Sequence, residues 1–312
     1  MSLVSNRVPA RSTRDSETGF LLDPCQYFLY LKKSGISYHA GWYATRLPAA
    51  KNPGGDRKSL KALILSAGQG KRLFPLTADR PKCAITLYGQ SMIEWQIDEL
   101  LGCGVEDICV VLGYGADKAE KLLQVRYGQG RIRTLFNPFS SVSDNLASCW
   151  IARGEMREDF ILLNGDTLFD FPVLEKLLDS APHPITVTID RKKSYDADDM
   201  KVILDGERLV RIGKDLPFDR VHAESIGMLL FRGEGPDLFR RSVEEALREP
   251  TALKRWYLSV IDELAQLKPV WSCCIEGLAW GEVDCPADLE HAEDVVRGIA
   301  GRQKSSRCGA LA

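Results

Sequence analysis

One phrase of the sequence, LSAGQGKRLFPLTADRPK at residues 65–82, carries residue types that suit phosphate binding. It follows the apolar run ALIL, whose length and composition are typical of a buried strand. Gly68 and Gly70 would let backbone N–H groups close around an anion at the end of that strand. Three cations follow in the same phrase and match a polyphosphate in sign: Lys71, Arg72 and Lys82.

The loop fits neither of the two commonest phosphate-binding motifs. A Walker A loop needs glycine five positions before Gly70, where this chain has Leu65, and the dinucleotide-binding fingerprint needs glycine at Leu73. The cations also have a simpler interpretation as solvated loop charges, and Lys71 in particular could face solvent. Their place behind two glycines at a strand end favours phosphate contact for Arg72 and Lys82.

Two carboxylates stand where predicted strands end or helices begin. Asp166 closes FILLNGD, and Asp284 lies in EVDCPADLEHA just before a predicted helix. Taken alone, Asp166 could close a turn or cap a helix that begins near Val173, and Asp284 could be an N-cap or a turn residue.

Strands and helices alternate through the first half of the chain. Ser91 and Glu94 have the spacing of a capping box and open a predicted helix over residues 91–104. Such alternation predicts an α/β fold with a largely parallel sheet. We expect four strands, at 62–65, 107–113, 133–137 and 160–166, and one further helix at 116–128.

The second half changes character. Its short extended runs are separated by turn residues, which predicts hairpins added to the α/β frame. We expect strands at 185–190, 201–206, 208–213, 225–231 and 270–277, and helices at 235–249, 256–267 and 287–299.

Composition excludes several classes of protein. The 312 residues carry 41 Lys+Arg against 43 Asp+Glu, so no basic field would hold a nucleic acid. The nine cysteines form no Cys-x-x-Cys pair, which argues against a zinc site and a disulfide framework. The first thirty residues lack a leader pattern and no long apolar run is present, so we expect a cytoplasmic protein without a membrane partner.

The domain boundaries follow from periodicity. Residues 1–59 lack sustained periodicity and end in RLPAAKNPGGDRKS, so we expect a poorly ordered N-terminal extension. A single domain is expected over 60–301, followed by a short tail at 302–312.

The phrase at 65–82, the NGD at 164–166 and the EVDCPADLEHA at 282–292 occur in the order typical of one family. Together they resemble the nucleotidyltransferases, which join a nucleoside triphosphate to a phosphorylated acceptor. The resemblance implies a Rossmann-like three-layer fold with a mixed, mostly parallel sheet and a small hairpin-rich acceptor-binding part. It also implies that Asp166 and Asp284 bind Mg²⁺, and that catalysis uses Arg72, Lys82, Asp166 and Asp284.

Two further phrases, NPFSSVSDNLASCWIAR at 137–153 and DRKKSYDADDMKV at 190–202, look most like the branch that contains choline-phosphate and small-phosphonate cytidylyltransferases. This resemblance implies CTP as the nucleotide and a small phosphate or phosphonate as the acceptor. The nucleotide-binding residues are then expected to be Leu65, Ala67, Gly68, Gly70, Lys71, Arg72, Ser143, Asp144, Asn145 and Asp166. The acceptor-binding residues are expected to be Lys82, Asp190, Tyr195 and Lys214.

Two alternatives stay open. The chain could be a sugar-1-phosphate nucleotidyltransferase that uses UTP, dTTP or GTP, although sugar-phosphate members usually carry a different glycine-rich phrase at 137–148. It could also be a catalytically inactive regulatory subunit, although it retains Arg72, Lys82, Asp166 and Asp284 together. Charged side chains near 190–199 leave the acceptor's own charge undecided, and the sequence is compatible with a homo-oligomer without requiring one.

Overall fold

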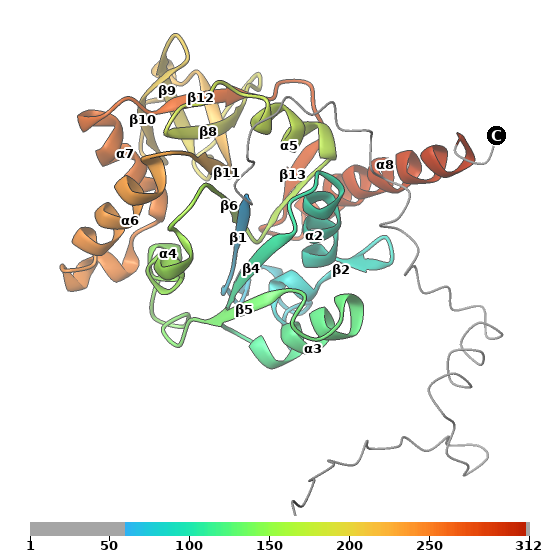
Figure 1. The fold of residues 1–312 in the computed structure, drawn as a ribbon. Coiled ribbons are helices and arrows are strands. Elements are labelled where there is room, and N and C mark those ends of the chain that lie inside the picture. The colour runs from blue at the N-terminus through green and yellow to red at the C-terminus, as the bar shows by residue number, and fades with distance from the viewer. Residues whose placement is uncertain (1–59, 310–312) are drawn as a thin grey trace, which may run out of the picture. The chain divides into compact units, whose positions relative to one another are not determined.

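The structure of the protein, a computed structural model, describes residues 60–309, so the predicted extension at 1–59 lies outside the described residues. A nine-stranded sheet with the order β5-β4-β1-β6-β11-β8-β12-β10-β9 forms the frame (Figure 1). Its strands are β1 (Lys61–Ser66), β4 (Asp107–Leu112), β5 (Arg133–Phe136), β6 (Phe160–Asn164), β8 (Ile185–Asp190), β9 (Lys201–Asp205), β10 (Arg208–Gly213), β11 (Ala223–Phe231) and β12 (Trp271–Cys274).

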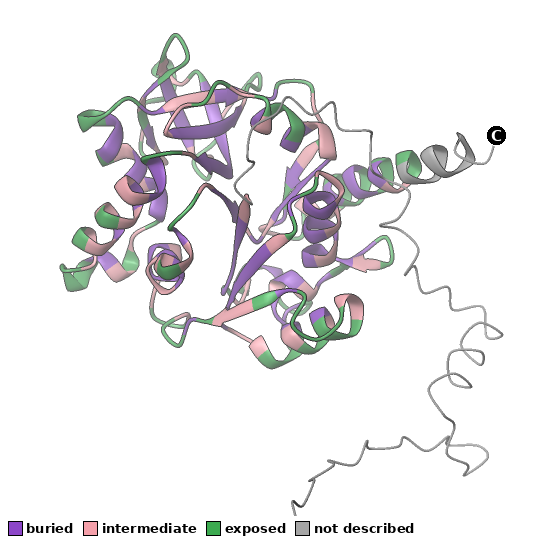
Figure 2. Ribbon diagram, viewed as in Figure 1, coloured by how far each residue is buried: buried purple, intermediate pink, exposed green. Residues whose placement is uncertain are grey.

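Strand β1 pairs in parallel with both β4 and β6, as the alternation of strands and helices predicts. It is buried on both faces: Ala62 and Ile64 belong to one core, and Leu63 and Leu65 to the other. Apolar residues at every position of a strand are required when helices cover both sides of a sheet. Figure 2 shows these central strands as buried along almost their whole length.

Helices form a layer on each face of the sheet (Figure 1). On one face lie α2 (Met92–Gly102), α3 (Ala116–Tyr127) and α5 (Phe171–Leu178). On the other lie α4 (Asn145–Ile151), α6 (Gly235–Ala246) and α7 (Tyr257–Leu267). Helix α2 begins with the predicted capping box, because the Ser91 hydroxyl accepts from Glu94 N–H and the Glu94 carboxylate accepts from Ser91 N–H. The three-layer α/β architecture predicted from the sequence is therefore confirmed.

The predicted hairpin strands join the main sheet instead of forming a separate unit. β9 pairs with β10 and also with the start of β11, through Ala223 and Glu224. Strands β11, β8, β12, β10 and β9 therefore follow one another in a closed circuit. This circuit holds the loops after β8 and β10 beside the start of β11.

A third, smaller core lies beside the main sheet, under α8 (Asp288–Gly309). It contains two short antiparallel pairs, β2 (Thr86–Leu87) with β3 (Gln90–Ser91), and β7 (Thr167–Phe169) with β13 (Trp280–Glu282). Helix α8 continues into the predicted tail at 302–312. The pair β7–β13 matters for function because it brings residues 280–284 next to the end of β6.

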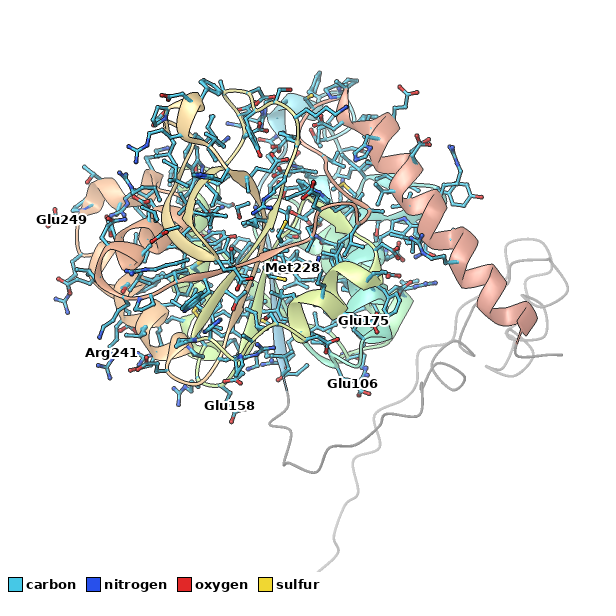
Figure 3. The ribbon with its side chains drawn as sticks, turned by 90° about the horizontal axis from the view of Figure 1, so that it is seen from above. Glu106, Glu158, Glu175, Met228, Arg241 and Glu249 are labelled. Carbon is cyan, nitrogen blue, oxygen red and sulfur yellow. The ribbon has the colours of Figure 1, made fainter. Side chains whose placement is uncertain are left out.

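Charged side chains surround these cores. In Figure 3, Glu106, Glu158, Arg241 and Glu249 lie at the periphery, whereas Met228 of β11 lies in the interior and is fully buried. Among the described helices, none combines the length and the apolar character needed to cross a membrane.

Candidate active site

A cleft of about 490 Å³ opens where β1 and β6 end. Parallel strands bring their carboxyl ends to one edge of the sheet, which is where open α/β sheets bind ligands. All ten residues predicted to bind the nucleotide line this cleft: Leu65, Ala67, Gly68, Gly70, Lys71, Arg72, Ser143, Asp144, Asn145 and Asp166. Lys82 and Asp284, predicted from separate motifs, line it as well.

The glycine loop leaves its amide groups free. Within the described residues, the N–H groups of Gly68, Gln69 and Gly70 donate no hydrogen bond. Gly70 has φ 69°, and a Cβ there would lie 2.9 Å from Cβ of Lys82, so the fold itself requires glycine. A Cβ at Gly68 would meet nothing within 4 Å, so that glycine instead leaves open space beside the free amides. Free amides and open space together suit a bound anion.

Lys82 joins the two predicted metal-binding carboxylates. Its Nζ lies 2.8 Å from Oδ2 of Asp166 and 2.6 Å from Oδ1 of Asp284. Burial of the ammonium opposes its charge, but the two carboxylates outweigh burial and raise the pKa of Lys82. Burial likewise opposes the charge of Asp284, and Lys82 and Arg72 outweigh it and lower the pKa of that carboxyl. Both groups are therefore charged at neutral pH.

A third carboxylate, Glu282, completes the acidic cluster. Ligand oxygens of Asp166, Glu282 and Asp284 all lie within 4.8 Å of one another. Desolvation by the surrounding protein, and then the charges of Asp166 and Asp284, raise the pKa of Glu282. Sequence reasoning missed this residue, although Glu282 and Asp284 are two positions apart in an extended segment and so share a face.

These carboxylates fit a divalent cation. Mg²⁺ prefers a few carboxylate oxygens together with phosphate and water. Oδ1 of Asp166 is buried and has no hydrogen-bond partner among the described residues, so it has a free lone pair for such an ion. The ammonium of Lys82 lies between two of the carboxylates, which is where a cation is stabilised.

Three further polar atoms at the cleft are buried without a partner among the described residues. They are Oγ of Ser66, Oγ of Ser143 and Oδ1 of Asn164. Buried polar atoms are normally hydrogen-bonded, so a group that leaves them open is suited to a ligand. Ser143 was predicted; Ser66 and Asn164 were missed, although both lie inside recognised motifs, the first in SAGQG and the second in NGD.

The other two members of the predicted polar cluster also hold the local structure together. Asp144 is the N-cap of α4, because Oδ1 accepts from the N–H of Asn145 at 2.9 Å. Oδ1 of Asn145 accepts from the N–H of Tyr257 at 2.9 Å. Asp144 and Asn145 therefore stabilise the start of α4 and its contact with α7, whereas the Ser143 hydroxyl has no partner among the described residues.

Asp190, Tyr195 and Lys214 do not line this cleft. They lie in residues 190–201 and 213–224, two segments that we name the acceptor side. Asp190 ends β8 and accepts from the indole N–H of Trp280 at 2.7 Å. Because Trp280 and Glu282 belong to the same strand, β13, the acceptor side is tied directly to the acidic cluster.

An ion-pair bridge links Lys214 to the cleft. Oδ2 of Asp198 lies 2.9 Å from Nη1 of Arg72, and Oδ1 lies 3.4 Å from Nζ of Lys214. Nη2 of Arg72 lies 3.0 Å from Asp284. The Asp198 side chain is 70% exposed, so this bridge crosses the mouth of the site, where solvent screens it. Asp198 is one of the charged side chains near 190–199 whose preference for the acceptor's charge the sequence left undecided, and its pairing with Arg72 was not predicted.

A second charged group lies deeper on the acceptor side. Nζ of Lys192 lies 2.7 Å from Asp199 and 2.9 Å from Glu224, and 5.8 Å from the ring centre of Tyr195. Burial raises the pKa of Glu224 to about 7, even though Lys192 opposes the shift. Burial also acts on Asp199, but hydrogen bonds from Lys192 and from a backbone N–H lower its pKa. Each charge in this group has an internal partner.

Comparison with known proteins gives concordant results. The family described as "Nucleotidyl transferase" matches residues 61–204. The CMP-5'-(3-aminopropyl)phosphonate synthase of Streptomyces rubellomurinus is 29% identical over 250 residues, which cover 76% of this chain and 39% of that protein. The choline-phosphate cytidylyltransferase of Streptococcus pneumoniae is 31% identical over 110 residues, which cover 35% of this chain and 46% of that protein. The chain thus spans less than half the length of these curated relatives.

Solved structures share the fold. The CTP:phosphocholine cytidylyltransferase of Streptococcus pneumoniae superposes with a TM-score of 0.63 at 18% identity, over 77% of this chain and 100% of that one. The inositol-1-phosphate CTP transferase of T. maritima gives a TM-score of 0.65 at 21% identity, over 78% and 97%. At these identities the likeness concerns the fold alone. Together with the match of residues 61–204 to the family described as "Nucleotidyl transferase", it confirms the resemblance predicted from the motifs.

Proposed function

We propose that the protein is a CTP-dependent cytidylyltransferase that transfers CMP to a small phosphate or phosphonate acceptor and releases pyrophosphate. The observation that carries this proposal is the cleft at the ends of β1 and β6. There the free amides of Gly68 to Gly70 lie in one cavity with Arg72, Lys82 and the carboxylates of Asp166 and Asp284. Donors for a triphosphate and ligands for its counter-ion are thus combined at a single site.

The chemistry needs position and charge more than a protein nucleophile. An oxygen of the acceptor's phosphate or phosphonate attacks the α-phosphorus of CTP, the bond from that phosphorus to the bridging oxygen breaks, and pyrophosphate leaves in line. The glycine-loop amides and Arg72 would hold the phosphates of the leaving group. Lys82, charged because its two carboxylates raise its pKa, would offset negative charge at the reacting phosphate.

Asp166, Asp284 and Glu282 would hold Mg²⁺. The ion, when bound, neutralises charge on the transferring phosphate and orients it. Lys214 at the edge of the cleft would face the acceptor's phosphate, with Asp190 and Tyr195 nearer to its other end. The bridge from Arg72 through Asp198 to Lys214 supports this arrangement because it brings the two proposed phosphate-binding cations to one carboxylate.

Cytidine and a small acceptor are supported by the relatives. Proteins named for CMP-aminopropylphosphonate synthesis, choline-phosphate cytidylyl transfer and phosphoglutamine cytidylyl transfer all match this chain. The hydroxyl of Ser143 and the strand end at Leu65 would read the base. We assign the activity to residues 60–301 and propose a cytoplasmic location, with which the free thiols of Cys83, Cys103, Cys109, Cys149, Cys273, Cys274 and Cys285 are consistent.

An acceptor panel tests the proposal. The protein is incubated with Mg²⁺, each of CTP, UTP, dTTP and GTP, and each of phosphocholine, 2-aminoethylphosphonate and glucose-1-phosphate, and pyrophosphate is measured. We expect release with CTP and one of the two small acceptors, and the same release from a chain that begins at Arg57. Turnover of glucose-1-phosphate with UTP or dTTP would instead support the sugar-phosphate alternative. No release with any pair would support an inactive regulatory subunit.

A further inference from the structure

Lys201 is a buried lysine within the phrase DRKKSYDADDMKV, and no role was predicted for it. It is the first residue of β9 and is only 1% exposed. Its backbone pairs with Gly213 of β10 on one side and with Glu224 of β11 on the other. Lysine is almost never fully buried unless its charge is paired, so its partners need an explanation.

The ammonium of Lys201 is held by neutral groups. Nζ donates to the carbonyl oxygen of Lys214 at 2.6 Å and makes a longer contact of 3.5 Å with the carbonyl oxygen of Asp199. It also lies 4.7 Å from the ring centre of Phe218, within the range of a cation–π contact. Among the residues the structure describes, no carboxylate lies within 4.0 Å of this nitrogen.

These contacts join the two segments of the acceptor side. Asp199, whose side chain pairs with Lys192, belongs to the same loop as Asp198. Lys214 directly follows β10. Asp198 in turn pairs with the Lys214 ammonium, which lies 4.9 Å from the ring centre of Trp256. A single buried nitrogen therefore fixes the backbone from which the Lys214 side chain projects.

Stability alone does not account for a lysine here. Burying an ammonium without a carboxylate partner is unfavourable, and apolar residues of similar volume commonly replace buried charges without loss of stability. Methionine has nearly the same length and shape and would fill the same space. A contribution to the site explains the lysine better than a contribution to the core.

We propose that Lys201 is a positioning residue that fixes Lys214 and the loop at 196–200 in the geometry that binds the acceptor. The proposal rests on the function proposed above, in which Lys214 faces the acceptor's phosphate. Lys201 acts through the backbone and does not contact the acceptor, because its ammonium donates to the carbonyl groups of Lys214 and Asp199.

The test compares Lys201→Met with Lys268→Met, which changes an exposed lysine at the end of α7. With CTP and whichever of 2-aminoethylphosphonate or phosphocholine the wild type uses, Lys201→Met should raise the acceptor KM about tenfold. The KM for CTP should stay within about twofold, because the glycine loop is untouched. Lys201→Gln, whose amide can still donate to one carbonyl, should give an intermediate acceptor KM, and it serves as the test variant if Lys201→Met does not fold.

Hydrogen exchange of the free protein gives a second readout that needs no turnover. Amides in 196–200 and 213–220 should exchange faster in Lys201→Met, while those in 164–170 keep their wild-type rates. Unchanged exchange in both segments, or equal rises in both KM values, would overturn the proposal. If the wild type releases no pyrophosphate with any acceptor, the proposed function fails, while the exchange rates still decide whether Lys201 holds the two segments together.

Discussion

The two halves of the site differ in whether their polar groups have partners within the protein. On the nucleotide side, which we define as residues 65–72, 143–145 and 164–166, several groups have no partner among the described residues: the N–H groups of residues 68–70, the hydroxyls of Ser66 and Ser143, and Oδ1 of Asn164 and of Asp166. On the acceptor side, charges are satisfied by one another, as Lys192 is by Asp199 and Glu224. The nucleotide side is thus open to a ligand as it stands, whereas an acceptor must compete with ion pairs that already exist.

The difference follows from the local architecture. The nucleotide side is built from the ends of buried parallel strands, whose geometry is fixed by two cores, so unpaired groups can be held in place. The acceptor side consists of loops around the closed strand circuit, with exposed charges such as Asp198. We therefore expect changes in the proposed metal ligands, of which Asp166 lies on the nucleotide side, to alter turnover most, and changes on the acceptor side to alter affinity and stability.

The largest expected effect tests the acidic cluster. Asp166→Ala and Asp284→Ala should each lower kcat by at least about a thousandfold, or about 4 kcal/mol, because each removes a ligand for the ion that neutralises the transferring phosphate. Circular dichroism should show an intact fold, and the exposed Asp205→Ala serves as the control. The double variant should lose little more than either single variant. A loss equal to the product of the single losses would show that the two carboxylates do not share one metal ion.

The next prediction concerns Glu224 and the pH dependence of stability. Its pKa is raised from 4.5 to about 7 in the folded protein, so between these values the folded state binds more protons than the unfolded state. This contribution is fully present below pH 4.5 and is lost as the pH rises through 7, with an upper limit of about 3 kcal/mol. Relative to wild type, Glu224→Gln should become more stable as the pH is raised from 5 to 8.

Urea unfolding of both proteins at several pH values measures that difference. The exposed Glu276→Gln is the matched control, and its difference from wild type should stay constant over the same range. A constant difference for Glu224→Gln as well would mean that Lys192 holds this carboxyl ionised throughout, and that the acceptor side is fully paired at all of these pH values.

Local signals made most of the fold predictable. The capping box of Ser91 and Glu94 and the apolar runs of β1, β4 and β6 depend on neighbours in the sequence, and the structure forms these elements where they were expected. The position of β8 between β11 and β12 depends on pairings between distant segments, which no local pattern encodes. For the same reason the closure of the strand circuit by β9 could not be predicted.

In the site, as in the fold, the residues that lie in short sequence phrases were predictable, whereas contacts between distant segments were not. The glycine loop and the two aspartates belong to short phrases that can be recognised one at a time. The bridge from Arg72 to Asp198 joins residues 126 positions apart, and the contact of Lys192 with Glu224 likewise exists only after the sheet has formed. Glu282 is the exception, since its alternation with Asp284 in an extended segment was available from the sequence alone.

The third prediction concerns recognition of the base on the nucleotide side. Cytosine and uracil differ at N3 and at the exocyclic position, where cytosine has a donor and uracil an acceptor. The wrong base leaves a buried polar group of the pocket without a partner, which weakens its binding. We expect CTP to be preferred over UTP by at least about tenfold in kcat/KM, or about 1.4 kcal/mol. Ser143→Ala should reduce this preference, because it removes the unpaired hydroxyl in the cleft. The exposed Thr251→Ala should leave it unchanged, and a preference unaffected by Ser143→Ala would move base recognition to the strand end at Leu65.

The smallest expected effect addresses the exposed bridge between the two sides. The Asp198 carboxylate pairs with Arg72 and Lys214, the two cations that we assign to phosphates, so it competes with the substrates for them. Surface ion pairs are worth up to about 1 kcal/mol, so Asp198→Asn should lower the acceptor KM about threefold at low salt. High salt screens exposed charges and should abolish the difference between variant and wild type.

Asp205→Asn, which removes an exposed carboxylate at the end of β9, is the matched control for the lost charge and should leave the acceptor KM unchanged at either salt concentration. A higher KM in Asp198→Asn would reverse the interpretation, because the carboxylate would then be needed to hold Arg72 and Lys214 in place. In that case the ion pairs of the acceptor side would arrange the site before the acceptor binds. The acceptor would then not have to compete with these ion pairs, and the contrast with the unpaired groups of the nucleotide side would no longer hold.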